Sequence, residues 1–273
     1  MNQLVGEKLS IATFKAQTTR HRIMGIVNTD DAQIVFSDTP GVLKPNYKMQ
    51  EMMLQFSESA LADADTLLYV TDVVENPEKN MDFLDKVSKM TIPVILLINK
   101  IDESDQKKLG NLVETWHKLL PNAEILPLSA KNKFGIDILM KRILELLPES
   151  PAFFDKDQLT DKPAKFFVSE IIREKILRYY DKEIPYSVEV VIERFKEDDR
   201  QIHINAIIYV ERSSQKGIII GHQGMALKKV STEARKSLER FFDKKIFLET
   251  YVKVDKDWRN SQKELNNFGY NPE

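Results

Sequence analysis

The chain has 273 residues, of which 42% are hydrophobic and 30% are charged, and this is enough for one or two domains with a sizeable core. Cysteine is absent, which excludes a disulfide framework, a thiolate zinc site and a cysteine nucleophile. No stretch reaches the roughly 18 consecutive apolar residues of a membrane span, and the first residues lack the pattern of a signal peptide.

The net charge of −2 is unevenly distributed along the chain. Residues 1–150 carry 17 Lys and Arg against 21 Asp and Glu, whereas residues 151–273 carry 23 against 21. Within Arg212–Lys245 there are nine basic and three acidic residues. Such a concentration of positive charge predicts a nucleic-acid surface, and a solvated helix face is the alternative.

The first half of the chain alternates short apolar strands with helices. Met1, Leu4 and Val5 have helical spacing, Gly6 is expected to end that helix, and residues 11–22 predict a loop. Strands are expected at 23–27, 33–38, 66–73, 93–98 and 123–128, and helices at 47–64, 80–90, 109–120 and 135–147. The alternation predicts an α/β fold with a doubly wound, mostly parallel sheet that is covered on both faces.

Polar sequences follow three of these strands, where an α/β sheet binds its ligands. The first is Asp38-Thr39-Pro40-Gly41. An acidic residue at a strand end can hold Mg²⁺ through a water, and the following glycine offers a backbone N–H to a phosphate. An ordinary Pro-Gly turn is the alternative for this sequence.

The second sequence, Asn99-Lys100-Ile101-Asp102, predicts a guanine site. Asp102 can accept hydrogen bonds from N1–H and the exocyclic amine of guanine, which adenine does not offer. Asn99 can bond the base edge and neighbouring loops, and the stem of Lys100 can cover the ring. The third sequence, Ser129-Ala130-Lys131, can place backbone amides on the guanine O6. A charged turn after a strand is the alternative at residues 99–102.

Together the three sequences resemble the GTP-binding domain of translation-factor-like P-loop GTPases. AQTTRHR at Ala16–Arg22, followed by DTPG at Asp38–Gly41, is similar to the Era-type GTPases. The resemblance implies that Thr19 (or Thr18) and Asp38 hold Mg²⁺, Asp38 through water, and makes Thr19 a candidate catalytic residue. Val42 stands where Ras-like enzymes carry a water-orienting Gln, so we expect slow hydrolysis without a partner. The residues expected to bind GTP or GDP are Asp38, Thr39, Pro40, Gly41, Val42, Asn99, Lys100, Ile101, Asp102, Ser129, Ala130 and Lys131.

The phosphate-binding sequence G-x-x-x-x-G-K-[ST] does not occur in the chain. In the family it lies just before a sequence such as Met1–Gly6, so the chain is expected to begin inside the first helix, without the first strand and the P-loop. One explanation is a start assigned at an internal methionine, and the other is a natural chain that has abandoned GTP. By this resemblance, we expect the chain as written to bind GTP at least about a thousandfold more weakly than a version extended upstream.

The second half of the chain begins with a predicted linker at residues 149–164, in which Phe153 and Phe154 are expected to pack onto a neighbour. A helix at 167–180, strands at 186–195 and 201–210, an apolar run at 218–220, a helix at 225–242 and a strand at 246–254 follow. Gly221-His222-Gln223-Gly224 stands directly before the second of these helices.

This order of elements around G-x-x-G resembles the type II KH domain, an α+β RNA-binding fold. Glycines let an RNA backbone approach closely, and the helix N-terminus favours phosphate. The candidate RNA-binding residues are Lys216, Ile218, Ile219, Ile220, Gly221, His222, Gln223, Gly224, Lys228 and Lys229. The alternative for His222 is an exposed loop residue without a ligand, and His21, His117 and His203 show no metal-binding pattern.

EIIREKI at Glu170–Ile176 and IPYSV at Ile184–Val188 extend the resemblance to Era-type GTPases over nearly the whole chain. It implies a GTPase domain at 1–148 and a KH domain at 165–273, with GTP hydrolysis, Mg²⁺ as cofactor, and small-subunit ribosomal RNA and the small ribosomal subunit as partners in rRNA processing and subunit biogenesis. A cytoplasmic monomer is expected. Peripheral contact with the cytoplasmic face of the membrane is reported of the family, but nothing in the composition requires it. The alternative is a non-enzymatic RNA-binding assembly factor with a degenerate GTPase domain.

Overall fold

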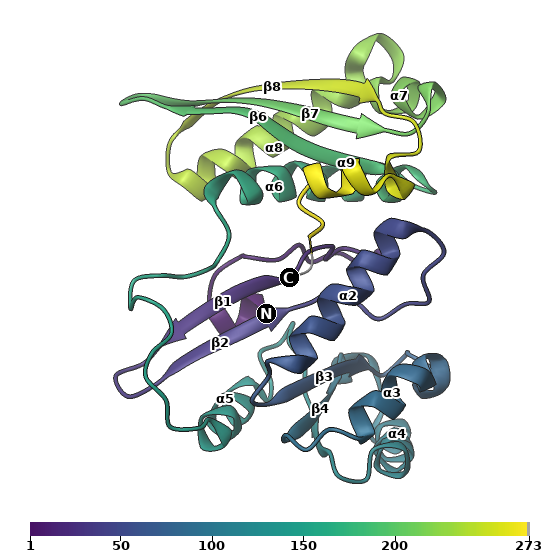
Figure 1. The fold of residues 1–273 in the computed structure, drawn as a ribbon, viewed down its shortest axis with the longest axis vertical. Helices are drawn as coiled ribbons and strands as arrows, with labels where there is room; N and C mark the ends of the chain where they lie inside the picture. The colour runs from purple at the N-terminus through teal and green to yellow at the C-terminus, as the bar shows by residue number, and fades with distance from the viewer. Residues whose placement is uncertain (272–273) are drawn as a thin grey trace. The chain divides into compact units, whose positions relative to one another are not determined.

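A computed structural model describes residues 1–271, so the last two residues of the predicted KH domain lie outside the described part (Figure 1). The helices are α1 (Asn2–Val5), α2 (Lys48–Ala62), α3 (Met81–Ser88), α4 (Gln106–Leu119), α5 (Ile136–Leu146), α6 (Ala164–Tyr179), α7 (Ser213–Ile220), α8 (Met225–Phe242) and α9 (Gln262–Asn267). The strands are β1 (Ile23–Asn28), β2 (Gln33–Asp38), β3 (Leu67–Asp72), β4 (Val94–Asn99), β5 (Glu124–Pro127), β6 (Val188–Glu197), β7 (Gln201–Val210) and β8 (Lys245–Val254).

The contacts divide the chain into two compact units. The first unit is Met1–Lys8, Gly25–Ser37 and Ser57–Leu159, and the second is Leu9–Met24, Asp38–Phe56 and Thr160–Glu273. The loop of residues 9–24 and the segment 38–56 therefore make their contacts with the C-terminal half of the chain. The domain limits expected from the sequence, at 148 and 165, stay a prediction.

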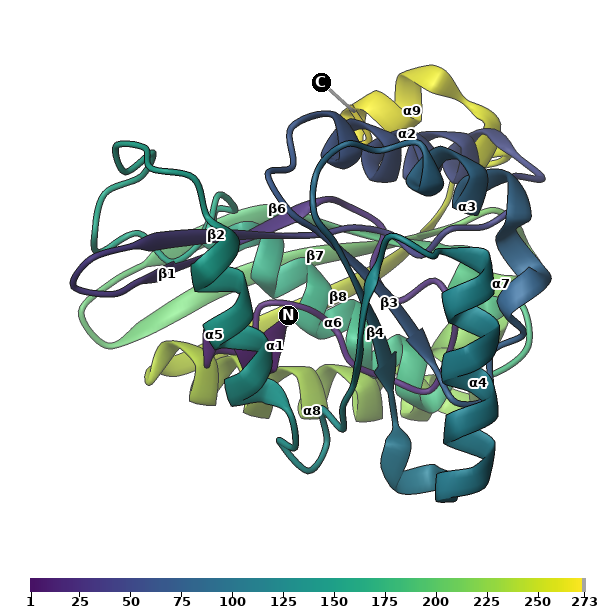
Figure 2. The ribbon, with the colours of Figure 1, turned by 90° about the horizontal axis from the view of Figure 1, so that it is seen from below.

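The three-stranded sheet of the first unit is parallel, with β4 between β3 and β5. Alternate residues of β4 face opposite sides. Ile95 and Leu97 pack with α5, whereas Leu96 and Ile98 pack with α3 and α4 (Figure 2). Apolar residues on both sides explain why β4 reads as a continuous run of Ile and Leu. The predicted doubly wound α/β arrangement is confirmed.

Strands β1 and β2 form a separate two-stranded sheet. Hydrogen bonds from the backbone of the predicted linker attach the linker to these two strands. Ile26 N donates to the Leu159 carbonyl at 2.8 Å, and the Gln33 side chain accepts from the backbone N–H groups of Phe153 and Phe154. The Phe153 side chain is 74% exposed, so the prediction that its ring packs the linker onto a neighbour is wrong. Hydrogen bonds of the linker backbone hold it instead, together with Asp161, whose side chain accepts from Met24 N at 2.8 Å.

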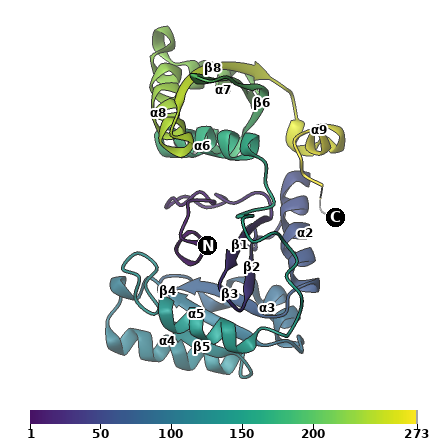
Figure 3. The ribbon, with the colours of Figure 1, turned by 90° about the vertical axis from the view of Figure 1, so that its left-hand side faces the viewer.

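The second unit contains a mixed sheet in which β7 pairs antiparallel with β6 and parallel with β8. Helices α6 and α8 cover one face of this sheet, where alternate strand residues join the largest core cluster (Figure 3). The parallel pair requires a crossover, which α7 and α8 provide. The element order predicted for a type II KH domain is confirmed. Within residues 1–271 there is no helix of the length and apolar character needed to cross a membrane.

Candidate functional site

The two sequences expected to read guanine meet in the first unit. Asn99 ends β4, Asp102 lies in the following turn, and Ser129 and Ala130 follow β5. The Asn99 side-chain oxygen accepts from Ala130 N at 3.0 Å, and the Ser129 hydroxyl donates to Asp102 Oδ1 at 2.6 Å. Parallel pairing of β4 and β5 brings both sequences to the same edge of the sheet.

These contacts also prepare the side chains for a ligand. The Ser129 hydroxyl holds the pKa of Asp102 below its ordinary value, and Lys131 Nζ, 3.8 Å from Asp102 Oδ2, acts in the same direction. Asp102 is therefore ionised and can only accept hydrogen bonds, as recognition of N1–H and an exocyclic amine requires. The Asn99 oxygen faces Ala130 N–H, so its amide nitrogen is left to donate elsewhere.

Lys100 is positioned by a residue that the sequence did not single out. Its backbone is left-handed, with φ of 62°, and its ammonium donates to Asp72 Oδ2 at 2.6 Å. This hydrogen bond raises the pKa of Lys100. Asp72 is the last residue of β3, beside Asn99 at the end of β4. With Ser129 after β5, all three strands of this parallel sheet are thus followed by or end in polar groups. The signal was present in the sequence, because TLLYVTDV also places an acid at a strand end.

Asp38 and Thr19 are neighbours in the second unit. Thr19 Oγ1 lies 3.5 Å from Asp38 Oδ2. Burial raises the pKa of Asp38, whereas hydrogen bonding, including that of Thr19, acts in the opposite direction. A carboxylate whose charged form is disfavoured by burial gains from a cation, and a carboxylate with a hydroxyl offers the oxygen ligands that Mg²⁺ prefers. The residues present therefore fit Mg²⁺.

Within the DTPG sequence Gly41 is exposed, whereas Pro40 is buried. No atom lies within 4 Å of a side chain built at Gly41, and residues 39–42 adopt no helix or strand. A ligand can therefore approach the Gly41 backbone closely. Among residues 1–271 no three His, Asp or Glu side chains gather to hold a metal. The ligands of Mg²⁺ beside Asp38 would come largely from nucleotide and water, as is usual for this ion.

A buried arginine that the sequence did not reveal anchors the loop carrying Thr19. Arg20 is 1% exposed and donates to the carbonyls of Val188 at 2.6 Å and Pro185 at 3.0 Å, and to Glu189 Oε2 at 3.2 Å. The Tyr270 hydroxyl donates to the same Glu189 oxygen at 2.8 Å. Burial alone would lower the pKa of Arg20, but its interactions with Tyr270 and with the negative charge of Glu189 outweigh it and raise the pKa.

The residues on either side of Thr19 are therefore held by elements of the KH domain. Arg173 of α6 donates to the Thr18 carbonyl and binds Glu170 through two nitrogens, at 2.7 and 2.6 Å. His21 packs against Tyr270, with ring centroids 4.4 Å apart. Burial, together with the positive charge of Arg173, lowers the pKa of His21 to about 3, so this histidine is neutral.

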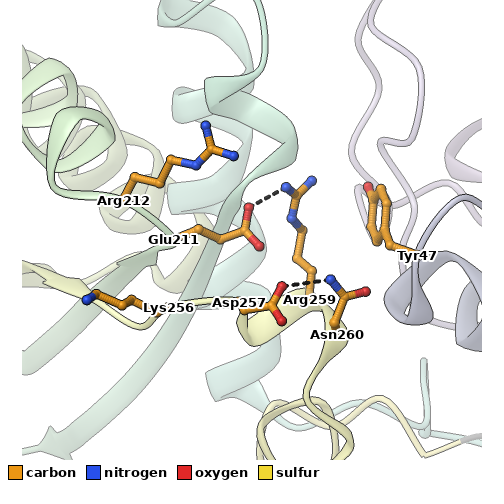
Figure 4. A pocket seen from close by; sticks show the side chains of 7 residues that line it. All are labelled: Tyr47, Glu211, Arg212, Lys256, Asp257, Arg259 and Asn260. Carbon is orange, nitrogen blue, oxygen red and sulfur yellow. Dashed lines mark hydrogen bonds and ion pairs between the residues drawn. The ribbon is translucent and has the colours of Figure 1, made fainter.

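A second contact joins the start of α2 to the turn after β8 (Figure 4). The Arg259 guanidinium lies 4.6 Å from the centre of the Tyr47 ring and forms an ion pair with Glu211. Asn260 Oδ1 accepts from Lys48 N at 3.3 Å and so satisfies an otherwise unbonded N–H in the first turn of α2. A cavity of about 390 Å³ lies here, lined by Tyr47, Glu211, Arg212, Lys256, Asp257, Arg259 and Asn260.

The two glycines of the G-x-x-G loop have different structural roles. Gly221 has φ of 71°, and a Cβ there would lie 2.6 Å from Ala226 Cβ. Gly224 has φ of 75°, but nothing lies within 4 Å of its would-be Cβ. Gly221 is thus required for packing between α7 and α8. Gly224 leaves an open surface at the N-terminus of α8, where a phosphate is favoured.

The residues flanking the loop divide into a buried and an exposed group. Ile219 is fully buried in the core, so its predicted contact with RNA bases through the side chain is wrong. The α-helical geometry of α7 turns Ile219 inward, whereas Ile218 is 50% exposed. Lys228 is exposed, and Lys229 Nζ lies 4.4 Å from the centre of the Tyr179 ring. Lys216 and Ile220 are half-buried, and His222 and Gln223 are exposed.

Comparison with known proteins gives the same two parts. Residues 1–100 match the family described as 50S ribosome-binding GTPase, and residues 183–259 match the KH domain family. GTPase Era of Clostridium kluyveri is 42% identical over 272 residues, which are 99% of this chain and 93% of that protein. GTPase Era of Leuconostoc citreum is 43% identical over 277 residues, covering 100% of this chain and 91% of that protein.

The chain belongs to the Era family of GTPases. Solved Era structures agree with this assignment. Era in complex with MgGDPNP and nucleotides 1506–1542 of 16S ribosomal RNA has a TM-score of 0.94 and 36% identity, over 98% of this chain and 92% of the other. A variant of Aquifex aeolicus Era bound to GDP.AlF4- has a TM-score of 0.93 and 36% identity, over 98% and 93%. The Era-type resemblance and the GTPase fold followed by a KH domain are thus confirmed.

Membership of the Era family makes the chain a GTPase by descent, while the roles of single residues stay predictions. The structure brings Asn99 together with Ala130, and Asp102 with Ser129, as expected from the sequence. It also adds Asp72 in the first unit. The further additions lie in the second unit and hold the loop that carries Thr19: Arg20, His21, Arg173, Glu189 and Tyr270.

Proposed function

We propose that the chain binds GTP and GDP, hydrolyses GTP with Mg²⁺, and binds small-subunit ribosomal RNA in the maturation of the small ribosomal subunit. The observation that carries the nucleotide part is the pair of hydrogen bonds that joins Asn99 to Ala130 and Asp102 to Ser129. The RNA part is supported by the open Gly224 surface and by the 16S ribosomal RNA segment bound to a similar Era structure.

In this proposal Asp102 accepts from guanine N1–H and the exocyclic amine, and the backbone of the loop at residues 129–131 supplies an amide to O6. Lys100 covers the base with its stem while Asp72 holds its ammonium. Asp38, through water, and Thr19 hold Mg²⁺, and the Gly41 amide bonds the terminal phosphate. A bound Mg²⁺ supplies positive charge that offsets the charge developing on the phosphates.

A nuclear magnetic resonance titration tests the nucleotide part, because it detects weak as well as tight binding. GDP with Mg²⁺ is expected to shift the backbone amides of Asn99, Asp102 and Ala130, whereas ADP leaves them unchanged. Equal shifts with both nucleotides would remove the proposed base specificity. No shift with either would favour the alternative function, an RNA-binding assembly factor whose GTPase domain does not bind nucleotide.

We further propose that the nucleotide state controls RNA engagement. The support is that Thr18, Arg20 and His21, which flank the proposed magnesium ligand Thr19, are held by α6, β6 and Tyr270 of the KH-containing unit. A change in the position of Thr19 on hydrolysis would therefore strain these contacts. RNA affinity measured with GDPNP and with GDP tests this coupling, and equal affinities would refute it.

The proposal also includes a monomer in the cytoplasm. Peripheral contact with the cytoplasmic face of the membrane is the last element of the proposal, and its support is the resemblance to the family. Sedimentation with vesicles of acidic lipid tests the membrane contact, and size-exclusion chromatography with light scattering tests the monomer.

A further inference from the structure

The KH sheet has a second face, opposite α6 and α8, that is partly open (Figure 3). At one end of this face Tyr209 packs against Phe268, with ring centroids 5.2 Å apart, and Ile207 is fully buried. At the other end most side chains are exposed, while His203, Asn205 and Glu249 are half-buried. We call this exposed end the outer platform, and its residues are Arg194, Lys196, His203, Asn205, Lys245, Phe247, Glu249 and Tyr251.

Aromatic side chains stand on the outer platform. Phe247 is 49% exposed and Tyr251 is 50% exposed, although both lie on a strand whose alternate residues are buried in the core. His203 is the cross-strand neighbour of Phe247, and their ring centroids lie 5.6 Å apart. Exposed rings on the open face of a sheet are the feature on which single-stranded nucleic acids stack their bases.

Positive charge without partners surrounds these rings. Lys196 is the cross-strand neighbour of His203, Arg194 pairs with Asn205, and Lys245 precedes Phe247 by two residues. Within residues 1–271 no ion pair involves any of these three cations.

Two of the nearby acids are paired with lysines, and Asp198 Oδ2 lies 3.4 Å from His203 Nε2. Glu193 is paired with Lys253 at 3.3 Å, and Glu197 is paired with Lys244 at 2.8 Å. Glu249 remains on the platform, where it accepts a hydrogen bond from the Tyr251 hydroxyl. The net positive charge beside flat apolar rings complements a polymer of phosphates and bases, and it is unfavourable for burial against an apolar protein surface.

We propose that the outer platform binds a single-stranded segment of RNA, with bases stacked on Phe247 and Tyr251 and phosphates beside Arg194, Lys196 and Lys245. The platform is separate from the G-x-x-G loop. His203 lies seven residues before Val210, the end of β7 from which α7 continues, and this is roughly 23 Å along a strand. A second RNA-binding surface rests on the proposed RNA-binding function, from which RNA is taken as the bound polymer.

Fluorescence anisotropy with a short labelled single-stranded RNA tests the platform in the full chain. The Gly224→Asp variant is the parent, because it weakens the G-x-x-G surface. Adding Phe247→Ala is expected to lower the remaining affinity about tenfold, and Phe247→Tyr is expected to restore it, because a stacking ring is retained. Phe153→Ala removes an exposed ring from the linker and is the matched control.

The salt dependence gives an independent readout of the phosphate contacts. Lys196→Gln is expected to reduce the slope of log affinity against log salt by about 0.7, the value for one phosphate contact on a single strand. Lys118→Gln, an exposed lysine of α4, is the matched control and is expected to leave the slope unchanged. Circular dichroism melting checks that each variant is folded.

Photochemical cross-linking with RNA that contains 4-thiouridine locates the contact. Cross-links to the peptide of β8, lost in Phe247→Ala, are the expected result. Cross-links confined to residues 216–229, with affinity and salt slope unchanged in Phe247→Ala and Lys196→Gln, would overturn the platform and leave the G-x-x-G proposal intact. Failure of the chain with Gly224 intact to bind any RNA would overturn both.

Discussion

Replacing Arg20 with Met tests most sharply how the loop of residues 9–24 is held. Methionine keeps much of the length of the side chain but removes every donor. The structure gives Arg20 hydrogen bonds to two carbonyls and to Glu189, all inside the second unit. Without Arg20, the partners that residues 1–271 leave to the buried Glu189 carboxylate are the Tyr270 hydroxyl and the Val190 amide.

Removal of one partner from a buried ion pair costs about 3–5 kcal/mol, because the other charge is left uncompensated in a medium of low polarity. This is a large fraction of the total stability of about 5–15 kcal/mol that a domain has. We therefore expect Arg20→Met to lower the free energy of unfolding of the second unit by about 3–5 kcal/mol.

Urea denaturation followed by tryptophan fluorescence measures this loss. The chain has two tryptophans, Trp116 in the first unit and the fully buried Trp258 in the second, so a Trp116→Phe background isolates the second unit. Arg200→Met, an exposed arginine in the turn before β7, is the control and is expected to change stability by about 0.5 kcal/mol or less. Adding Glu189→Gln to Arg20→Met should recover part of the loss, because no uncompensated charge remains. A loss below about 1 kcal/mol in Arg20→Met would refute the reasoning.

Three further predictions follow. Asp102→Asn is expected to shift preference from guanine toward xanthine nucleotides, because an amide donates where the carboxylate accepts; competition between GDP and XDP measures it, and unchanged preference contradicts the guanine site. The pKa of His21 is about 3 in the folded protein and 6.5 in an unfolded chain, so between these values the unfolded state binds one more proton and stability falls as the pH falls. The free energy of unfolding should decrease by about 2 kcal/mol between pH 7 and pH 5 because of this residue. In urea titrations at the two pH values, His21→Phe should lack this decrease. In thermal melts, Gly224→Ala should destabilise the KH domain by about 1–2 kcal/mol, the cost of a left-handed backbone. Gly221→Ala should destabilise it more, because a Cβ at residue 221 also meets Ala226. Equal losses in the two variants would exclude that contact.

Local sequence patterns predicted most of the helices and strands. The strand at Gln33–Asp38, the strand at Gln201–Val210 and the helix at Met225–Phe242 have the bounds expected from periodicity. These elements carry β-branched alternation or a helical apolar stripe, which tertiary packing reinforces. The placement of the proposed guanine-binding residues side by side was also predicted, because they lie at strand ends and parallel strands end at one edge of a sheet.

Long-range polar contacts were not predictable in the same way. Arg20 and Glu189 are separated by 169 positions, and Glu189 and Tyr270 by 81, and no periodicity links them. Arg20 stands in a polar loop that reads as solvent-exposed, since charged residues are rarely buried unless paired. The error at Ile219 has a different cause. An apolar triplet before G-x-x-G suggests a continuous surface, but a helix turns its middle residue into the core.

RNA binding by the Gly224 variants tests the central claim most directly. Alanine and aspartate at residue 224 both add a Cβ to a left-handed backbone, but only aspartate places a negative charge at the N-terminus of α8. In filter binding with a 3′ segment of small-subunit ribosomal RNA, Gly224→Asp is expected to bind at least about tenfold more weakly than Gly224→Ala, a difference of about 1.4 kcal/mol. Equal affinities of the unsubstituted chain and both variants would contradict the claim that this KH domain binds RNA through its G-x-x-G loop.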